Sequence, residues 1–194
     1  GTIINASDGV INLTSGIGVA TKGYSGPTFT GVIRNDGTIL STAGGTAIFT
    51  YGSQNIKGGT IENNGIIRIN GGTSATGVSI RGFSTFTNNN EVSGSASASS
   101  SFSGLLTGDS GAQLINSSTG VITGKNYANG VYIANSSLTN QSFVKNDGII
   151  TVEKGYGIYA LASNVENNGS ITSNNYGIYA TKYSNASPFS TVIN

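Results

Sequence analysis

Six tyrosines between positions 127 and 179 are the side chains with the clearest capacity to bind a partner. Each lies within three residues of a glycine, and three of them end the pattern glycine, apolar residue, tyrosine. They are Tyr127, Tyr132, Tyr156, Tyr159, Tyr176 and Tyr179. Because tyrosine combines flat apolar area with a hydroxyl, an exposed group of tyrosines can bind a sugar or a protein. The same residues can instead stack across neighbouring strands and stabilise the fold, and the sequence leaves both interpretations open.

Asp8 and Asp36 are the pair of acidic residues whose positions suggest a paired acid or a cation site. Each precedes the glycine of a repeated corner, so in stacked copies the two carboxylates would lie about one strand spacing apart, ~4.8 Å. Aspartate before glycine is also typical of an ordinary turn, and Asn64 occupies the equivalent position in the next copy. We therefore expect an ordinary turn at both positions, with no bound metal and no cofactor. A cation site formed by this pair is the weaker alternative.

The composition excludes several kinds of chemistry. The chain has no histidine and no cysteine, so imidazole and thiol catalysis are excluded. Only 9% of its residues are charged and the formal net charge is +1, which indicates no nucleic-acid partner. Its eight carboxylates lie mainly at turns and provide few candidates for an acid and base pair. We predict that the protein is not an enzyme.

A short corner motif positions these side chains. The pattern apolar-x-Asn-x-Gly-x-apolar returns along the chain, as in the segments 33–39 and 144–150, and such a return is the signature of a stacked repeat. The corner asparagines are Asn5, Asn35, Asn63, Asn88, Asn116, Asn146, Asn167 and Asn194. Their mean spacing of 27 residues is too short for a strand-helix-strand unit, and no segment between them has helical periodicity. Each repeat must therefore consist of short strands and turns.

Alternating side chains define strands on both sides of each corner. Ile67 and Ile69, for example, share a face opposite Arg68. Stacking the repeats forms two continuous apolar columns, one running from Ile3 to Val192 and the other from Ile11 to Ile171. A third strand follows the glycines beside the tyrosines, although its early copies fit less well. The pattern predicts a right-handed parallel β-helix of about seven coils with three short strands per coil.

The corner asparagines are expected to form a structural ladder rather than a binding surface. Asparagine tolerates left-handed backbone and bonds locally, and stacked amides hydrogen-bond from coil to coil.

Residues 1–194 are expected to form a single β-helix segment that is a piece of a longer protein. Within it, the Ser/Ala/Gly-rich run 94–103 is predicted to be an extruded loop. No apolar run approaches the roughly 18 residues of a membrane span, so no transmembrane segment is expected in this chain. Neither end shows a polar cap, so we expect either a longer continuous β-helix or end-to-end self-association.

The recurrent Asn-x-Gly-x-Ile corners, the Gly-Ile-Tyr-Ala strands and the Ser/Thr/Asn/Gly bias resemble passenger domains of bacterial autotransporters (type V secretion) and related surface adhesins. This resemblance implies a bacterial outer-surface or secreted location and a role as adhesin or structural stalk. The expected partner is then a host-cell or bacterial surface protein or glycan. A polysaccharide-processing β-helix, such as a lyase, a hydrolase or a tailspike fragment, is the alternative.

Overall fold

The computed structural model describes residues 1–21, 30–51, 57–73, 75–96, 104–127, 129–135, 141–184 and 188–194. Within these ranges the chain forms 22 strands, and none of its regular structure is helical. No helix suited to crossing a membrane is therefore found in the described part of the chain.

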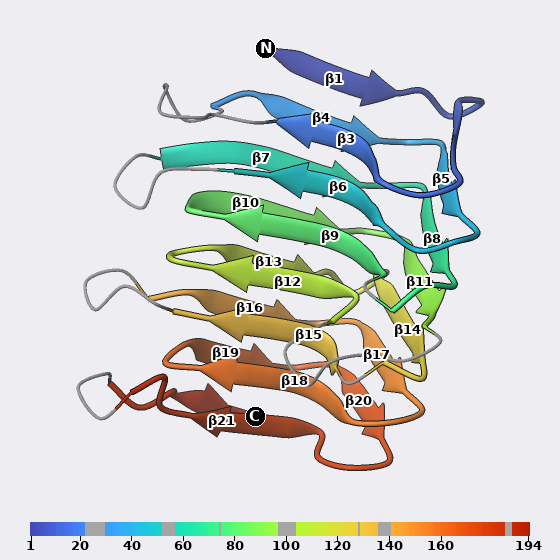
Figure 1. The fold of residues 1–194 in the computed structure, drawn as a ribbon. Helices are drawn as coiled ribbons and strands as arrows, with labels where there is room; N and C mark the ends of the chain where they lie inside the picture. Colours follow the sequence, from blue (N-terminus) through green and yellow to red (C-terminus); the bar gives the residue numbers. More distant parts are fainter. Residues whose placement is uncertain are drawn as a thin grey trace.

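The strands form three parallel sheets that wind into one right-handed rod (Figure 1). The first sheet contains, in spatial order, β1 (Thr2–Asn5), β4 (Val32–Asn35), β7 (Lys57–Asn63), β10 (Phe83–Asn88), β13 (Gln113–Asn116), β16 (Phe143–Asn146), β19 (Asn164–Asn167) and β22 (Val192–Ile193). The second contains β2 (Val10–Leu13), β5 (Thr38–Ser41), β8 (Ile66–Asn70), β11 (Glu91–Ser95), β14 (Val121–Lys125), β17 (Ile149–Val152) and β20 (Ser170–Ser173). The third contains β3 (Ile17–Thr21), β6 (Thr46–Thr50), β9 (Thr76–Arg81), β12 (Leu106–Asp109), β15 (Asn129–Ala134), β18 (Tyr156–Leu161) and β21 (Ile178–Thr181). Each of seven successive coils thus supplies one strand to every sheet, which confirms the predicted β-helix.

The core is a stack of apolar columns, because alternate residues of each strand point into the rod. The two predicted columns are confirmed in register, with Ile33 paired to Ile61 and Ile39 paired to Ile67, and all four side chains are buried. The third sheet supplies another column, which consists of Val19, Ile48, Val78, Leu106, Val131, Ile158 and Ile178. Each fully buried side chain contributes about 1.5–3 kcal/mol, so these columns hold the coils together.

The asparagine ladder is confirmed over its whole length. Each side-chain amide Nδ2 donates to the Oδ1 of the next corner asparagine at 2.6–2.9 Å, from Asn5 through to Asn194. The ladder does not use the left-handed backbone that asparagine tolerates, since the described non-glycine residues with positive φ are Ser110, Asn126 and Ala162. A buried amide must satisfy both its donor and its acceptor. Each interior asparagine of the ladder does so, because it accepts from one neighbouring asparagine and donates to the other.

The corner glycines are explained by close packing between coils. A Cβ atom on Gly65 would overlap the backbone oxygen of Gly37, and one on Gly169 would overlap that of Gly148. In the fourth coil Asn90 replaces this glycine. The backbone hydrogen bond that follows it, from Glu91 N to Gly65 O, is 3.4 Å long. The equivalent bond from Ile66 N to Gly37 O is 2.9 Å. A side chain at this corner therefore weakens the contact with the coil before it.

The fourth coil differs from the sequence prediction in two ways. The predicted loop 94–103 starts too early, because Gly94 and Ser95 belong to β11 and Ala96 is buried. Residues 97–103 of that run lie outside the described residues. The third strand of this coil, β12, was not recognised from the sequence, although its Leu106 fills the core between Val78 and Val131.

The first and last strands of the first sheet are more exposed than those between them. Ile3 is 39% exposed and Val192 is 42% exposed, whereas Ile61 in the middle of the same column is fully buried. Association of copies through these ends stays a prediction.

Candidate functional site

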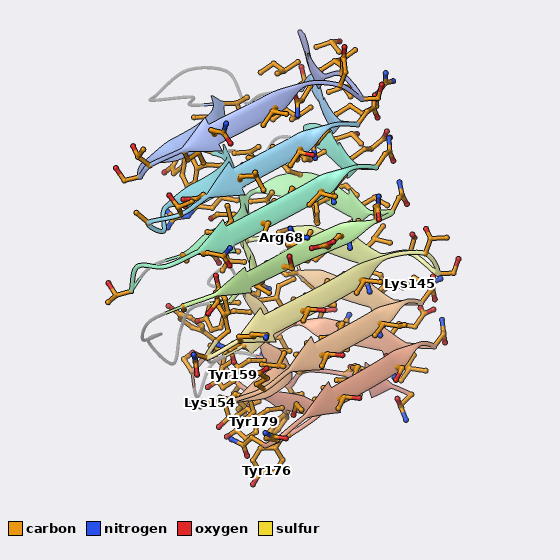
Figure 2. The ribbon with its side chains drawn as sticks, turned by 90° about the vertical axis from the view of Figure 1, so that its right-hand side faces the viewer. Arg68, Lys145, Lys154, Tyr159, Tyr176 and Tyr179 are labelled. Atoms are coloured by element: carbon orange, nitrogen blue, oxygen red, sulfur yellow. The ribbon has the colours of Figure 1, made fainter. Side chains whose placement is uncertain are left out.

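Five of the six tyrosines lie together on the outer face of the third sheet. Tyr132, Tyr159 and Tyr179 are register partners in β15, β18 and β21, each directly after an inward-pointing apolar residue. Tyr156 and Tyr176 form a second row just before the glycines of the last two coils, where Gly157 N donates to Tyr176 O. We call these five residues the tyrosine cluster. Figure 2 shows Tyr159, Tyr176 and Tyr179 side by side at the C-terminal end of the rod.

The rings of the tyrosine cluster contact each other continuously. Tyr159 stacks on Tyr132 and on Tyr179 with ring centroids 5.6 and 5.1 Å apart, and Tyr156 stacks on Tyr176 at 5.7 Å. The two rows also touch, because Tyr156 meets Tyr159 edge to face at 5.2 Å. The predicted cross-strand stacking is confirmed, and such pairs contribute about 0.5–1.5 kcal/mol beyond their buried area.

The stacking decides which parts of the tyrosines a partner can reach. Neighbouring rings cover much of one another, so the cluster presents ring edges and hydroxyl groups outward, with Tyr176 55% and Tyr179 36% exposed. Burial, with smaller contributions from the neighbouring Tyr159, Tyr183 and Asp109, raises the pKa of Tyr132 to about 12. Burial also raises the pKa of Tyr159, as do Tyr179 and Tyr156. At neutral pH these hydroxyls therefore stay protonated and can both donate and accept hydrogen bonds.

Tyr127 does not belong to this surface, and the prediction that placed it there is wrong. Its side chain is only 1% exposed, and its hydroxyl donates to the backbone oxygen of Ile69 at 3.4 Å. Burial raises the pKa of this hydroxyl. The register explains the error, because the partner of Tyr156 in the preceding coil is Asn129 and not Tyr127.

The space for Tyr127 comes from two glycines of the second sheet. Gly94 and Gly124 are register partners at an inward position where β8 carries Ile69 and β17 carries Val152. A Cβ atom on Gly94 would lie 2.8 Å from the Tyr127 hydroxyl, and one on Gly124 would lie 3.4 Å from the Tyr127 side chain. Two successive glycines between Ile69 and Val152 are the sequence signal that could have located this buried ring.

A pocket of about 240 Å³ lies beside the tyrosine cluster on the same sheet. Its described lining includes the outward residues Ser79, Arg81, Thr107, Asp109 and Tyr132, together with Tyr183. Arg81 also lies over the ring of Tyr51, with its Cζ 5.9 Å from the ring centroid, and Asp109 Oδ1 accepts a hydrogen bond from Ser110 Oγ at 3.0 Å. We call this the polar pocket. Sequence analysis missed Arg81 and Asp109 as site residues.

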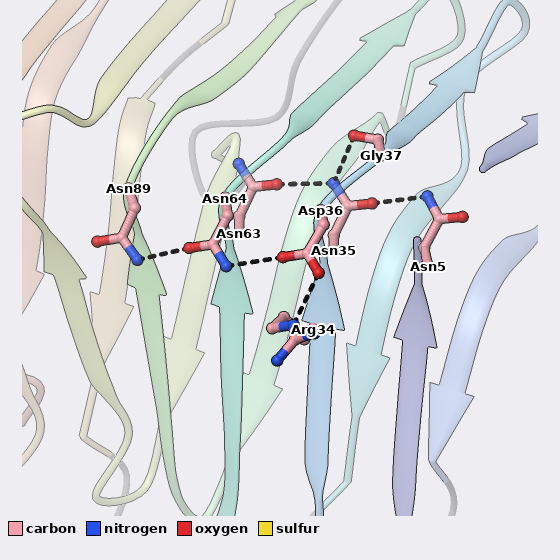
Figure 3. Close-up of polar contacts among 8 residues, drawn as sticks. All are labelled: Asn5, Arg34, Asn35, Asp36, Gly37, Asn63, Asn64 and Asn89. Atoms are coloured by element: carbon pink, nitrogen blue, oxygen red, sulfur yellow. Dashed lines mark hydrogen bonds and ion pairs between the residues drawn. The ribbon is translucent and has the colours of Figure 1, made fainter. Parts of the chain in front are cut away.

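Asp36 belongs to a hydrogen-bonded network at the corner, and its pairing with Asp8 stays a prediction. Its Oδ1 accepts from Asn64 Nδ2 and its Oδ2 from Arg34 Nε, each at 2.8 Å, as Figure 3 shows. Asp8 lies in a longer corner, where Gly9 N donates to Ala6 O. Among the residues that the structure describes, no group of three or more His, Cys, Asp or Glu side chains is arranged to hold a metal ion.

No protein-family model, curated protein or solved structure matches this chain. A β-helix by itself implies no activity, so the tyrosine cluster and the polar pocket are the features of this chain that bear on its function.

Proposed function

We propose that this chain is a non-enzymatic β-helix module of the bacterial outer surface, or secreted from it, that binds a surface glycan or protein through the tyrosine cluster. The observation that carries the proposal is the continuous contact of five tyrosine rings on one exposed face of the third sheet. The location rests on the resemblance of the repeats to autotransporter passengers and adhesins.

The cluster suits a partner rich in hydroxyl or amide groups. Its outward atoms are ring edges and protonated hydroxyls, which offer apolar contact and hydrogen bonds together. Tyrosine also loses little conformational entropy on binding, and here the stacked neighbours already restrain each ring. A rigid, hydrogen-bonded rod that holds such a surface fits adhesion better than turnover.

The polysaccharide-processing alternative has less support. Glycoside hydrolysis needs two carboxylates about 5–9.5 Å apart, whereas Asp109 is the one carboxylate among the described residues that line the polar pocket. Release of reducing sugar from common glycans, lost in Asp109→Asn, would favour this alternative and contradict our proposal.

Attachment of the purified chain to a glycan array and to cells tests the proposed function. The variant Tyr176→Ala/Tyr179→Ala should lose at least tenfold in affinity, because it removes the two most exposed rings of the cluster. Ile149→Ala removes apolar surface from an exposed residue of the second sheet and is the matched control. Equal binding by the wild type and the tyrosine variant, with both folded by circular dichroism, would overturn the proposal.

A further inference from the structure

The row of tyrosines on the third sheet stops where the polar pocket begins. Thr107 occupies the position of Tyr132 in the preceding coil, and Ser79 occupies it in the coil before that. Threonine and serine are much smaller than tyrosine, so the rod surface is hollowed at these two levels. The polar pocket is thus the place where two aromatic rings of the row are replaced by hydroxyl side chains.

A pair of opposite charges lines the same hollow. Arg81 and Asp109 are register partners in β9 and β12, two residues beyond Ser79 and Thr107 on the outward face. Tyr132 and Tyr183 provide aromatic wall. The pocket therefore combines a flat apolar surface, two hydroxyls, a guanidinium donor and a carboxylate acceptor.

We propose that the polar pocket binds one neutral sugar ring of a glycan. This inference rests on the proposed function and specifies the ligand. A volume of about 240 Å³ lies below the roughly 300–1,000 Å³ of sites for drug-sized ligands, so the pocket accommodates a single ring. A pyranose has an apolar face for a tyrosine wall, and its hydroxyls both donate to a carboxylate and accept from a guanidinium.

The two opposite charges favour an occupant without net charge. A sulfate, a phosphate or an acidic sugar would be attracted by Arg81 and repelled by Asp109, and a cation the reverse, so neither gains a net attraction from the pair. An aromatic side chain would fill the volume but would desolvate Arg81 and Asp109 without satisfying their hydrogen bonds. A ring that carries hydroxyls and no charge satisfies both groups.

Saturation-transfer NMR with free glucose, galactose, mannose, fucose and N-acetylglucosamine tests the proposal. At least one of these sugars should receive saturation from the wild-type chain. Thr107→Tyr continues the tyrosine row into the pocket, so it should abolish the transfer without unfolding the protein. Arg81→Met, which keeps the aliphatic stem, should weaken binding at least tenfold.

Two controls separate this proposal from the proposed function. Thr123→Tyr makes the same substitution at an outward, half-buried position of β14 on the second sheet and should bind sugar as the wild type does. Ile149→Ala, at an exposed residue of the second sheet outside both the cluster and the pocket, should also keep binding of the free sugar. Absence of transfer to every neutral sugar, unchanged transfer in Thr107→Tyr, or preferential binding of glucuronic acid would overturn the sugar pocket. If attachment to the array still depends on Tyr176 and Tyr179 in that case, the proposed function stands without it.

Discussion

Asn64 donates to Asp36, one coil toward the N-terminus, while its neighbour Asn63 donates to Asn88, one coil toward the C-terminus. Two amide ladders of opposite direction therefore run side by side at the corner (Figure 3). The outer one passes from Asn89 to Asn64 and ends on Asp36, because a carboxylate only accepts hydrogen bonds. Arg34 then supplies the compensating charge.

The outer ladder predicts a pH dependence of stability. The hydrogen bond from Asn64, together with Arg34, holds the pKa of Asp36 below its ordinary value of 3.8, although partial desolvation opposes the shift. A lowered folded-state pKa means that the stabilisation is present above pH 3.8 and is lost as the pH falls through the folded-state pKa. The stability advantage of the wild type over Asp36→Asn should therefore shrink between about pH 5 and pH 2. Urea unfolding at several pH values measures this difference, and a constant difference would contradict the assignment.

The asparagine ladder is the inner of the two ladders. It predicts that a substitution costs more stability in an interior coil than at the end of the rod. Asn88 is fully buried and bonds to both neighbouring asparagines, so Asn88→Ala should lower the free energy of unfolding by about 1–3 kcal/mol. Asn194 is exposed and accepts one ladder bond. Asn194→Ala should therefore cost less than about 1 kcal/mol. Denaturant titrations of the two variants compare these costs, and similar losses would mean that the ladder does not stabilise the interior coils.

Tyr127 and Tyr176 should lose very different amounts of stability on the same substitution. Tyr127→Ala empties a buried position and should cost about 3–5 kcal/mol, whereas Tyr176→Ala on the surface should cost about 1 kcal/mol. Tyr127→Phe keeps the ring and loses only a long hydrogen bond, so its stability should stay within about 1 kcal/mol of the wild type. Thermal unfolding of the three variants provides the comparison. A small loss for Tyr127→Ala would show that this ring is not part of the core.

The corner pattern was sufficient to predict the fold because it sets the register of two sheets directly. Asparagine, glycine and alternating isoleucines recur at equivalent positions, so aligning Asn35 with Asn63 already pairs Ile33 with Ile61 as the structure does. The third sheet was harder to predict, since the segments that lead to it vary in length from coil to coil. Leu106 follows the run 94–103, and its strand could not be aligned from that run alone.

The sequence predicted those site residues whose placement follows from the alternation of side chains along a strand. It failed for residues whose placement depends on how deeply the side chain is buried. Tyr132, Tyr159 and Tyr179 share one phase of the strand and were found together. Tyr127 was misplaced because the space it occupies depends on Gly94 and Gly124 in another sheet. Arg81 and Asp109 were missed because they lie in the coils where the tyrosine row is interrupted, so no repeated residue type marks the pocket.

The most direct test of the tyrosine cluster is a fluorescence titration with the glycan that binds best on the array. The chain has no tryptophan, so its emission comes from nine tyrosines, five of which form the cluster. The account predicts a saturable change in emission with the same Kd as array binding, retained in Ile149→Ala and lost in Tyr176→Ala/Tyr179→Ala. Saturable glycan binding that leaves tyrosine emission unchanged, or that persists at full affinity in the double variant, would contradict it.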